Sequence, residues 1–125
     1  MIVLDASALL ALLFREPGHE EVAARIRGSC LSTVNLSEVI GRFVRDGHNA
    51  QVVLRRVADS RVEFVPFTAS GAALAATLHP TTRSFGLSLA DRACLALALE
   101  RGIPVLTADR AWDQLDIGVT VQVIR

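Results

Sequence analysis

The sequence contains no lysine, because all thirteen of its basic residues are arginine. Biased codon usage is the simplest explanation, yet the absence also excludes any mechanism that needs a catalytic lysine. The thirteen acidic residues balance the arginines, so the net charge is zero. Bulk electrostatics therefore give no argument for a nucleic-acid partner.

Cysteine and histidine are also scarce. The two cysteines, Cys30 and Cys94, do not form a CxxC pair, and such residues are more often small core residues than metal ligands. The three histidines lie near Gly or Pro in polar connections and have no ligand spacing. Nothing in the sequence therefore indicates a zinc site.

Long hydrophobic runs are missing as well. The longest largely apolar stretches, Ala6–Phe14 and Ala93–Leu99, are much shorter than the roughly 18–20 residues of a membrane span. The chain opens with Ile2-Val3-Leu4 and has no basic lead-in, so we expect no signal peptide and a cytoplasmic location. With 125 residues, of which 51% are hydrophobic, we expect one folded domain spanning residues 1–125.

Short β-branched segments alternate with longer helical patterns along the chain. The predicted strands are Ile2–Asp5, Cys30–Thr33, Val62–Val65, Val105–Thr107 and Thr120–Val123. The predicted helices are Ala6–Phe14, His19–Arg27, Leu36–Arg45, Ala50–Ala58, Ala69–Leu78, Leu89–Arg101 and Arg110–Leu115. This alternation predicts an α/β protein whose mainly parallel sheet of about five strands lies between helices. In such sheets ligands bind beyond the carboxyl ends of the strands.

Two acidic residues are expected at the ends of strands. Asp5 follows Ile2–Leu4 and Asp109 follows Val105–Thr107, and each also has the position of a helix N-cap. Asp113 comes one turn after Asp109 and could share its face. A capping role alone would explain each of these residues.

Two further acidic residues are expected in the first turns of helices. Glu38 lies three residues after Asn35, which predicts a capping box with Asn35 as the cap. Asp91 has the same spacing after Ser88, but it shares a helix face with Leu95, so we expect its carboxylate to point into an apolar setting. Its neighbour Arg92 points about 100° away and is a poor partner for it.

The joint placement of the four acids is more informative than any one of them. In a parallel sheet all four would gather at the carboxyl edge, where their charges would repel one another and raise their pKa values. A hard divalent cation such as Mg²⁺ would resolve this repulsion, because it prefers oxygen ligands. We therefore interpret Asp5, Glu38, Asp91 and Asp109 as a metal site.

These residues and their surroundings resemble the PIN-domain nucleases, and among them the VapC toxins of bacterial toxin–antitoxin pairs. The motifs that carry the resemblance are Val3–Ala8, Ser37–Val39, Leu87–Asp91 and Leu106–Arg110, in this order along nearly the whole chain. The resemblance implies a three-layer α/β/α fold, homodimerisation, and inhibition by an antitoxin that lies across the active-site cleft.

The resemblance also implies roles for individual residues. Asp5, Glu38, Asp91 and Asp109 match the acidic quartet that binds Mg²⁺ or Mn²⁺ and catalyses hydrolysis of RNA. The accessory candidates are Ser7, Thr107 and Asp113. The candidates for contact with the RNA backbone are the arginines closest to the motifs, Arg15, Arg83, Arg92 and Arg110.

We therefore expect a Mg²⁺-dependent endoribonuclease that is the toxin of a toxin–antitoxin pair. Two alternatives stay open: a housekeeping RNA-processing nuclease of the same fold, and a non-catalytic module that binds RNA or a partner protein. A receiver domain and a haloacid-dehalogenase-like phosphatase are disfavoured because both need a lysine. The apolar first helix, which includes Leu9, Leu10, Leu12, Leu13 and Phe14, is expected to form part of an antitoxin groove or dimer contact, or to be buried in the core.

Overall fold

The computed structural model, which describes residues 1–125, has a five-stranded sheet at its centre. The strands are β1 (Ile2–Leu4), β2 (Ser29–Ser32), β3 (Glu63–Val65), β4 (Val105–Thr107) and β5 (Val121–Val123). They lie in the order β3-β2-β1-β4-β5, and every neighbouring pair is parallel. The expected parallel α/β sheet is confirmed, with the N-terminal strand in the middle.

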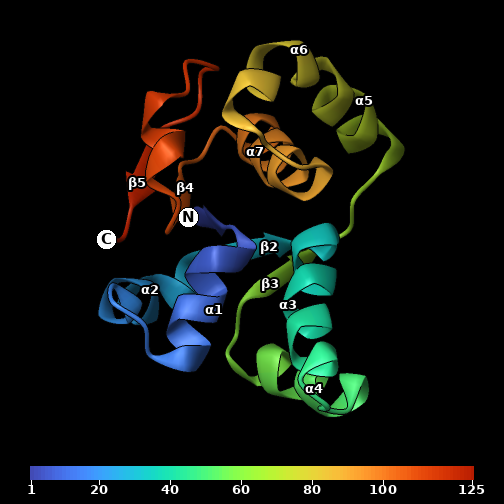
Figure 1. Ribbon diagram of the computed structural model, residues 1–125, viewed down its shortest axis with the longest axis vertical. Coiled ribbons are helices and arrows are strands. Elements are labelled where there is room, and N and C mark those ends of the chain that lie inside the picture. The colour runs from blue at the N-terminus through green and yellow to red at the C-terminus, as the bar shows by residue number, and fades with distance from the viewer.

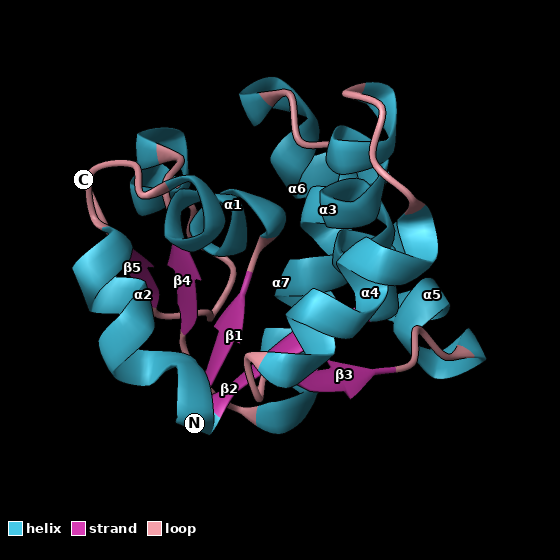
Figure 2. Ribbon diagram, turned by 90° about the horizontal axis from the view of Figure 1, so that it is seen from below, coloured by secondary structure: helices cyan, strands magenta, loops and turns pink.

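Helices cover both faces of the sheet, which gives three layers (Figures 1 and 2). One layer contains α1 (Ala6–Phe14), α2 (His19–Arg25), α3 (Thr33–Arg45) and α4 (Ala50–Asp59). The other contains α5 (Ala69–Thr77), α6 (His79–Thr82) and α7 (Leu89–Arg101). The remaining short 3₁₀ helices are η1 (Ile26–Gly28), η2 (Arg83–Phe85) and η3 (Arg110–Gln114).

The central strand shows why two hydrophobic cores form. Successive side chains of a strand point to opposite faces, so Ile2 and Leu4 pack into the core under α1–α4, while Val3 packs into the core under α7. Helix α7 is buried on most of its sides, because the six consecutive residues Ala93–Ala98 are all buried. Cys94 and Cys30 are free thiols in this second core, as the sequence predicts.

Helix α3 begins three residues earlier than expected. Ser32 is its N-cap, and the Ser32 hydroxyl accepts a hydrogen bond from the N–H of Val34 (3.2 Å). The prediction that Asn35 caps this helix is therefore wrong. The earlier start places Asn35 inside the first helical turn, where it is fully buried.

The segment before α7 also differs from the prediction. The expected helix Ala69–Leu78 ends at Thr77 and is followed by the short helix α6, which is not predicted; Pro80 lies in its first turn, where the missing N–H breaks no helical hydrogen bond. The last predicted helix is the 3₁₀ helix η3. None of the helices combines the length and the apolar character that crossing a membrane requires.

Candidate active site

Asp5 lies at the carboxyl edge of the sheet, directly after the central strand β1. It is only 4% exposed. Its Oδ1 accepts hydrogen bonds from the hydroxyl of Ser7 (2.7 Å) and the N–H of Ala8 (2.8 Å), and its Oδ2 accepts one from the hydroxyl of Thr107 (2.6 Å). Burial raises the pKa of Asp5 from 3.8 to about 6, although these hydrogen bonds act to lower it. The carboxyl group therefore changes its charge close to neutral pH.

Two hydroxyl residues connect Asp5 to the loop that follows β4. Ser7 accepts a hydrogen bond from the N–H of Ala108 (2.9 Å), and Thr107 accepts one from the N–H of Asp109 (3.0 Å). The same hydroxyl groups donate to Asp5, so each one joins the end of β1 to the end of β4. This network fixes the backbone of Asp109 relative to the Asp5 carboxylate.

Glu38 lies on the exposed side of α3, but its carboxylate is not free in solvent. The side-chain amide of Asn35 donates a hydrogen bond to Glu38 Oε1 (3.0 Å). Partial desolvation of the carboxylate raises the pKa of Glu38 above its ordinary value. The bond from Asn35 opposes this change, and the negative charge of Asp91 adds to it.

Asp91 and Asp109 both act as helix caps in this structure. Asp91 Oδ2 accepts from the N–H of Ser88 (2.9 Å), while the Ser88 hydroxyl accepts from the N–H of Asp91 (3.1 Å), which completes the predicted capping box. Asp109 accepts from the N–H of Ala111 (3.0 Å) and is exposed. The Asp91 carboxylate therefore folds back on its own helix end instead of pointing into an apolar setting, and the expectation from the helical projection is wrong.

Three of the four acids share one neighbourhood. The charge of Asp91 acts on both Asp5 and Glu38, and the charges of all three act on the buried thiol of Cys94, whose pKa is raised mainly by burial. For Asp5, however, mutual repulsion is the smallest of the contributions and desolvation the largest. Repulsion from Asp91 thus raises the pKa values of Asp5 and Glu38 in the expected direction, but desolvation is the larger cause for both.

No arginine neutralises these acids. None of the ion pairs in the molecule includes Asp5, Glu38, Asp91 or Asp109. At the same time, no three acidic, histidine or cysteine side chains converge closely enough in this conformation to hold one ion. The site thus has hard oxygen groups and no counter-charge, and three of its carboxylates, those of Asp5, Asp91 and Asp109, are engaged as helix caps.

The four candidate arginines have different surroundings. Arg92 is half-buried, and its guanidinium donates to the carbonyl of Ala75 in the last turn of α5 (3.0 Å). Arg110 donates to the carbonyl of Arg125 (2.8 Å), and Asp113 lines the same shallow surface pocket as Arg110 and Arg125. Arg15 and Arg83 are exposed.

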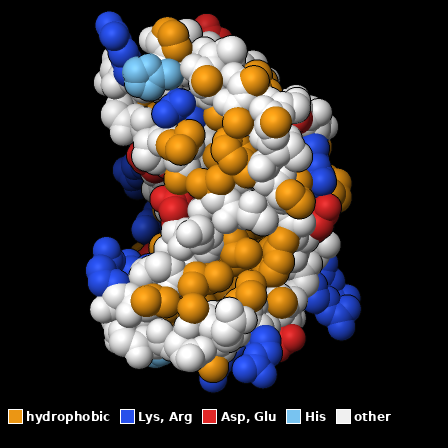
Figure 3. Space-filling view, turned by 90° about the vertical axis from the view of Figure 1, so that its right-hand side faces the viewer, with side chains coloured by type: hydrophobic (Ala, Val, Ile, Leu, Met, Phe, Trp, Pro, Cys, Tyr) orange, Lys and Arg blue, Asp and Glu red, His pale blue; other side chains and the backbone are white.

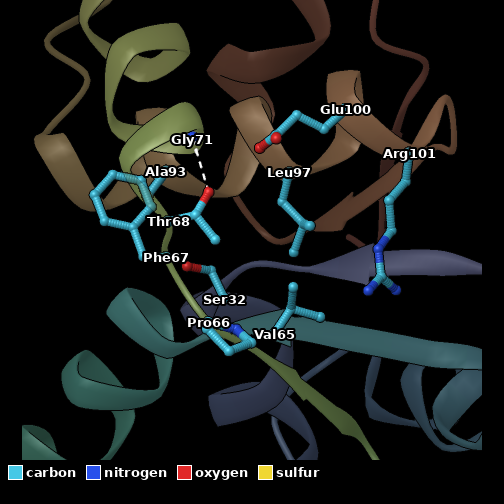
Figure 4. A pocket seen from close by; sticks show the side chains of 10 residues that line it. All are labelled: Ser32, Val65, Pro66, Phe67, Thr68, Gly71, Ala93, Leu97, Glu100 and Arg101. Atoms are coloured by element: carbon cyan, nitrogen blue, oxygen red, sulfur yellow. Dashed lines mark hydrogen bonds between the residues drawn. The ribbon is translucent and has the colours of Figure 1, made fainter.

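A separate cavity lies beside the edge strand β3, between α5 and α7 (Figure 4). Its charged residues are Glu100 and Arg101, which reach into it from the end of α7, and it contains none of the four candidate acids. Arg101 also forms a two-pronged ion pair with Glu63 (2.9 and 3.1 Å). This cavity is distinct from the acidic edge.

Asn35 contacts a second helix, a role that was not predicted from the sequence. Besides its bond to Glu38, it donates to the carbonyl of Ala90 in α7 (3.0 Å). One feature of the sequence pointed to this role. Asn35 lies four residues before the apolar Val39, and residues with this spacing share a helix face, so a polar side chain is placed on the buried face of α3.

The fold and the acidic edge together define an α/β protein with a cluster of oxygen groups beyond the carboxyl ends of its strands. The family model of the PIN domain matches residues 2–118. The chain therefore belongs to the PIN domain family.

Solved structures show the same fold along the whole chain. A toxin–antitoxin complex from Klebsiella pneumoniae is 18% identical, with a TM-score of 0.76 and coverage of 100% of this chain and 98% of the other. DNA-bound VapBC from Salmonella typhimurium is 18% identical, with a TM-score of 0.71 and full coverage of both chains (100%). VapBC-5 from Mycobacterium tuberculosis, of the VapBC family of toxin–antitoxin systems, is 24% identical, with a TM-score of 0.61 and coverage of 99% and 97%. A comparison with curated proteins found no match.

Proposed function

We propose that this PIN domain is a metal-dependent endoribonuclease that acts in the cytoplasm as the toxin of a toxin–antitoxin pair. The observation that carries the proposal is Asp5, a buried carboxylate without a cationic partner at the carboxyl edge of a PIN domain. The similarity of the fold to solved toxin–antitoxin complexes supports the toxin role.

The chemistry of the donor groups suits Mg²⁺, with Mn²⁺ as a substitute, because both ions prefer oxygen ligands. We assign the binding of the ion to Asp5, Glu38, Asp91 and Asp109, with Ser7, Thr107 and Asp113 as accessory residues. Asp91 caps its helix through Oδ2 alone and Asp109 through Oδ1 alone, so each keeps a second carboxylate oxygen for an ion. The proposal requires the ligand side chains to move closer together when an ion binds, because no three of them converge in this conformation.

The proposed reaction is hydrolysis of an RNA phosphodiester bond. Water attacks phosphorus, the bond to the 3′ oxygen breaks, and the products are a 3′-hydroxyl and a 5′-phosphate. When bound, the metal supplies activation of water and neutralisation of charge at the phosphate. Ser7 and Thr107 hold the Asp5 carboxylate in place, and the exposed residues Arg15, Arg83 and Arg110 are candidates for contact with RNA phosphates.

An apolar groove between α1, α3 and α4 is the proposed docking surface for the antitoxin. It is lined by Leu13, Phe43, His48, Val52, Val53, Arg56 and Val57. Figure 3 shows hydrophobic side chains gathered on the side of the molecule where α3 and α4 lie. In α1, Leu9 is fully buried, while Leu10, Leu12 and Leu13 are half-buried and Phe14 is exposed, so the end of this helix contributes to the groove. A homodimer contact is the other proposed use of this surface.

Cleavage of purified cellular RNA by the antitoxin-free protein tests the catalytic proposal. We expect discrete fragments with Mg²⁺, no fragments with EDTA, and none from Asp5→Asn. The matched control is Asp59→Asn, the same chemical change at an exposed residue at the end of α4, which should cleave like the wild type. Cleavage that persists in EDTA or in folded Asp5→Asn would contradict the proposal.

A non-catalytic module that binds RNA or a partner is the second candidate function. The observation that favours it is the lack of three converging ligand side chains in this conformation. Under this alternative the folded wild type binds RNA without cutting it in Mg²⁺ or Mn²⁺. A housekeeping nuclease would cut RNA but would lack an inhibitor, whereas a toxin should be silenced by a short DNA-binding protein encoded beside it.

A further inference from the structure

Asn35 occupies an unusual place for an amide side chain. It lies in the first turn of α3 and is 0% exposed. Its Nδ2 donates both of its hydrogens, one to Glu38 Oε1 and the other to the carbonyl of Ala90, each at 3.0 Å. One amide group therefore bridges α3 and α7.

The chemistry of the two partners fixes the orientation of this amide. A carboxylate and a backbone carbonyl can only accept hydrogen bonds here, so the NH₂ group must face both of them. Asn35 Oδ1 then faces away and is buried without a hydrogen-bond partner. An unpaired buried carbonyl is unfavourable, and packing of α3 alone would be served by an apolar residue such as Val39, one turn later.

The bridge has consequences for two of the proposed metal ligands. Glu38 is held through its side chain, while Asp91 is held through its backbone, because the carbonyl of Ala90 belongs to the peptide bond that Asp91 completes. The bridge thus connects one carboxylate on α3 to the helical turn that carries another on α7.

We propose that Asn35 is a positioning residue that sets the distance between Glu38 and Asp91 at the metal site by joining α3 to the first turn of α7. The inference rests on the proposed function, since it concerns a metal site formed by these acids. Asn35 itself binds no metal and acts through Glu38 and through the turn of α7 that carries Asp91.

Mn²⁺ binding to the RNA-free protein, measured by the paramagnetic resonance of free Mn²⁺, tests this role without any reliance on activity. Asn35→Leu keeps the number of side-chain heavy atoms and their branching at Cγ, and it removes both donors. We expect it to weaken Mn²⁺ binding about tenfold, which is the effect of losing an outer-shell partner of a ligand. Asn35→Thr keeps one donor and serves as the second variant if the leucine variant does not fold.

A double-mutant cycle separates positioning from general damage to the fold. In the Glu38→Gln background the Asn35 substitution should weaken Mn²⁺ binding less than it does in the wild type, because one of the two groups that Asn35 positions has already been altered. Equal weakening in both backgrounds would overturn the proposal, as would unchanged affinity in the single variant. The matched control is Val39→Ala, a buried change in the same helix, which should lower stability and leave Mn²⁺ affinity unchanged.

Mn²⁺ binding by the wild-type protein distinguishes a failure of the proposed metal site from a failure of the role of Asn35. If the wild type binds Mn²⁺ and Asn35→Leu binds it equally well, only the role of Asn35 is refuted. If the folded wild type binds no Mn²⁺, the proposed function is refuted and the role of Asn35 with it.

Discussion

Two carboxylates at the sheet, Asp5 and Glu63, show how strongly surroundings decide the behaviour of one chemical group. Asp5 follows the central strand β1, is almost fully buried, and has no cationic partner. Glu63 begins the edge strand β3, is exposed, and forms two hydrogen bonds with the guanidinium of Arg101. Burial raises the pKa of Asp5, whereas the hydrogen bonds from Arg101 lower the pKa of Glu63.

These surroundings determine which of the two acids is available for a ligand. The charge of Glu63 is already matched by Arg101. The charge of Asp5 is met only by neutral donors, and a metal ion would supply the missing opposite charge. The two sites should therefore respond in opposite directions to pH, which the following experiments test.

The largest expected effect on stability is the pH dependence due to Asp5. Since its pKa rises from 3.8 when unfolded to about 6 when folded, its contribution to stability is complete below pH 3.8 and is lost as the pH passes 6. The free energy of unfolding that is lost over this pH range amounts to about 3 kcal/mol. We therefore expect the wild type to lose stability between pH 4 and 7 relative to Asp5→Asn, which has no carboxyl group to titrate at this position. Urea denaturation of both proteins in EDTA, without divalent metal, measures the two unfolding free energies.

The same experiment has a metal-dependent control. Adding Mg²⁺ at pH 7 should stabilise the wild type and leave Asp5→Asn unchanged, because a ligand stabilises only the state that binds it. A difference between the two proteins that does not vary with pH would refute the burial account of Asp5.

Removal of the donors to Asp5 should have a smaller effect. Thr107→Val deletes a fully buried hydroxyl that donates to Asp5 and accepts from the N–H of Asp109. We expect the free energy of unfolding at pH 7 to fall by roughly 1.5–3 kcal/mol, as measured by urea denaturation. We also expect a further rise in the pKa of Asp5, as measured by NMR titration of the Asp5 carboxyl carbon. Thr107→Ser, which keeps the hydroxyl, is the control, and equal losses in both variants would indicate packing as the cause.

The smallest expected effect belongs to Glu63. Its lowered pKa means that its contribution to stability is present above the unfolded pKa and is lost as the pH falls, the reverse of Asp5. Because the pair with Arg101 is exposed, Glu63→Gln should cost only about 0.2–1 kcal/mol at pH 7, and less in high salt. A larger loss, or one insensitive to salt in thermal denaturation, would show that the pair is stronger than its exposure implies.

The layered fold could be predicted from the sequence because its pattern is local. Every strand except β2 contains a β-branched residue, and the longer helices, such as α3 and α7, are long enough for their period to be recognised. The ends of elements were harder. Ser32 and Asn35 are both good capping residues, so the sequence alone does not decide between them. Asn35 is buried because it contacts α7 at Ala90, which is 55 residues further along the chain.

The candidate site could be predicted in part for the same reason. The positions of Asp5 and Asp109 follow from strand ends, and the structure places both there. The direction of a side chain does not follow from position: Asp91 folds back on Ser88 although its helical projection points to apolar neighbours. The Asn35 bridge was missed because its partners come from two different helices.

The hydrogen bond between Asp5 and Thr107 also bears on how the protein comes into being. These two residues are 102 positions apart, and β1 has β4 as one of its two neighbours in the sheet. Contacts between such distant residues slow folding and require most of the chain to be present. A ribosome must therefore have synthesised at least the first 107 residues before the hydrogen bonds around Asp5 can be completed, and a chain cut short before β4 lacks the donor Thr107.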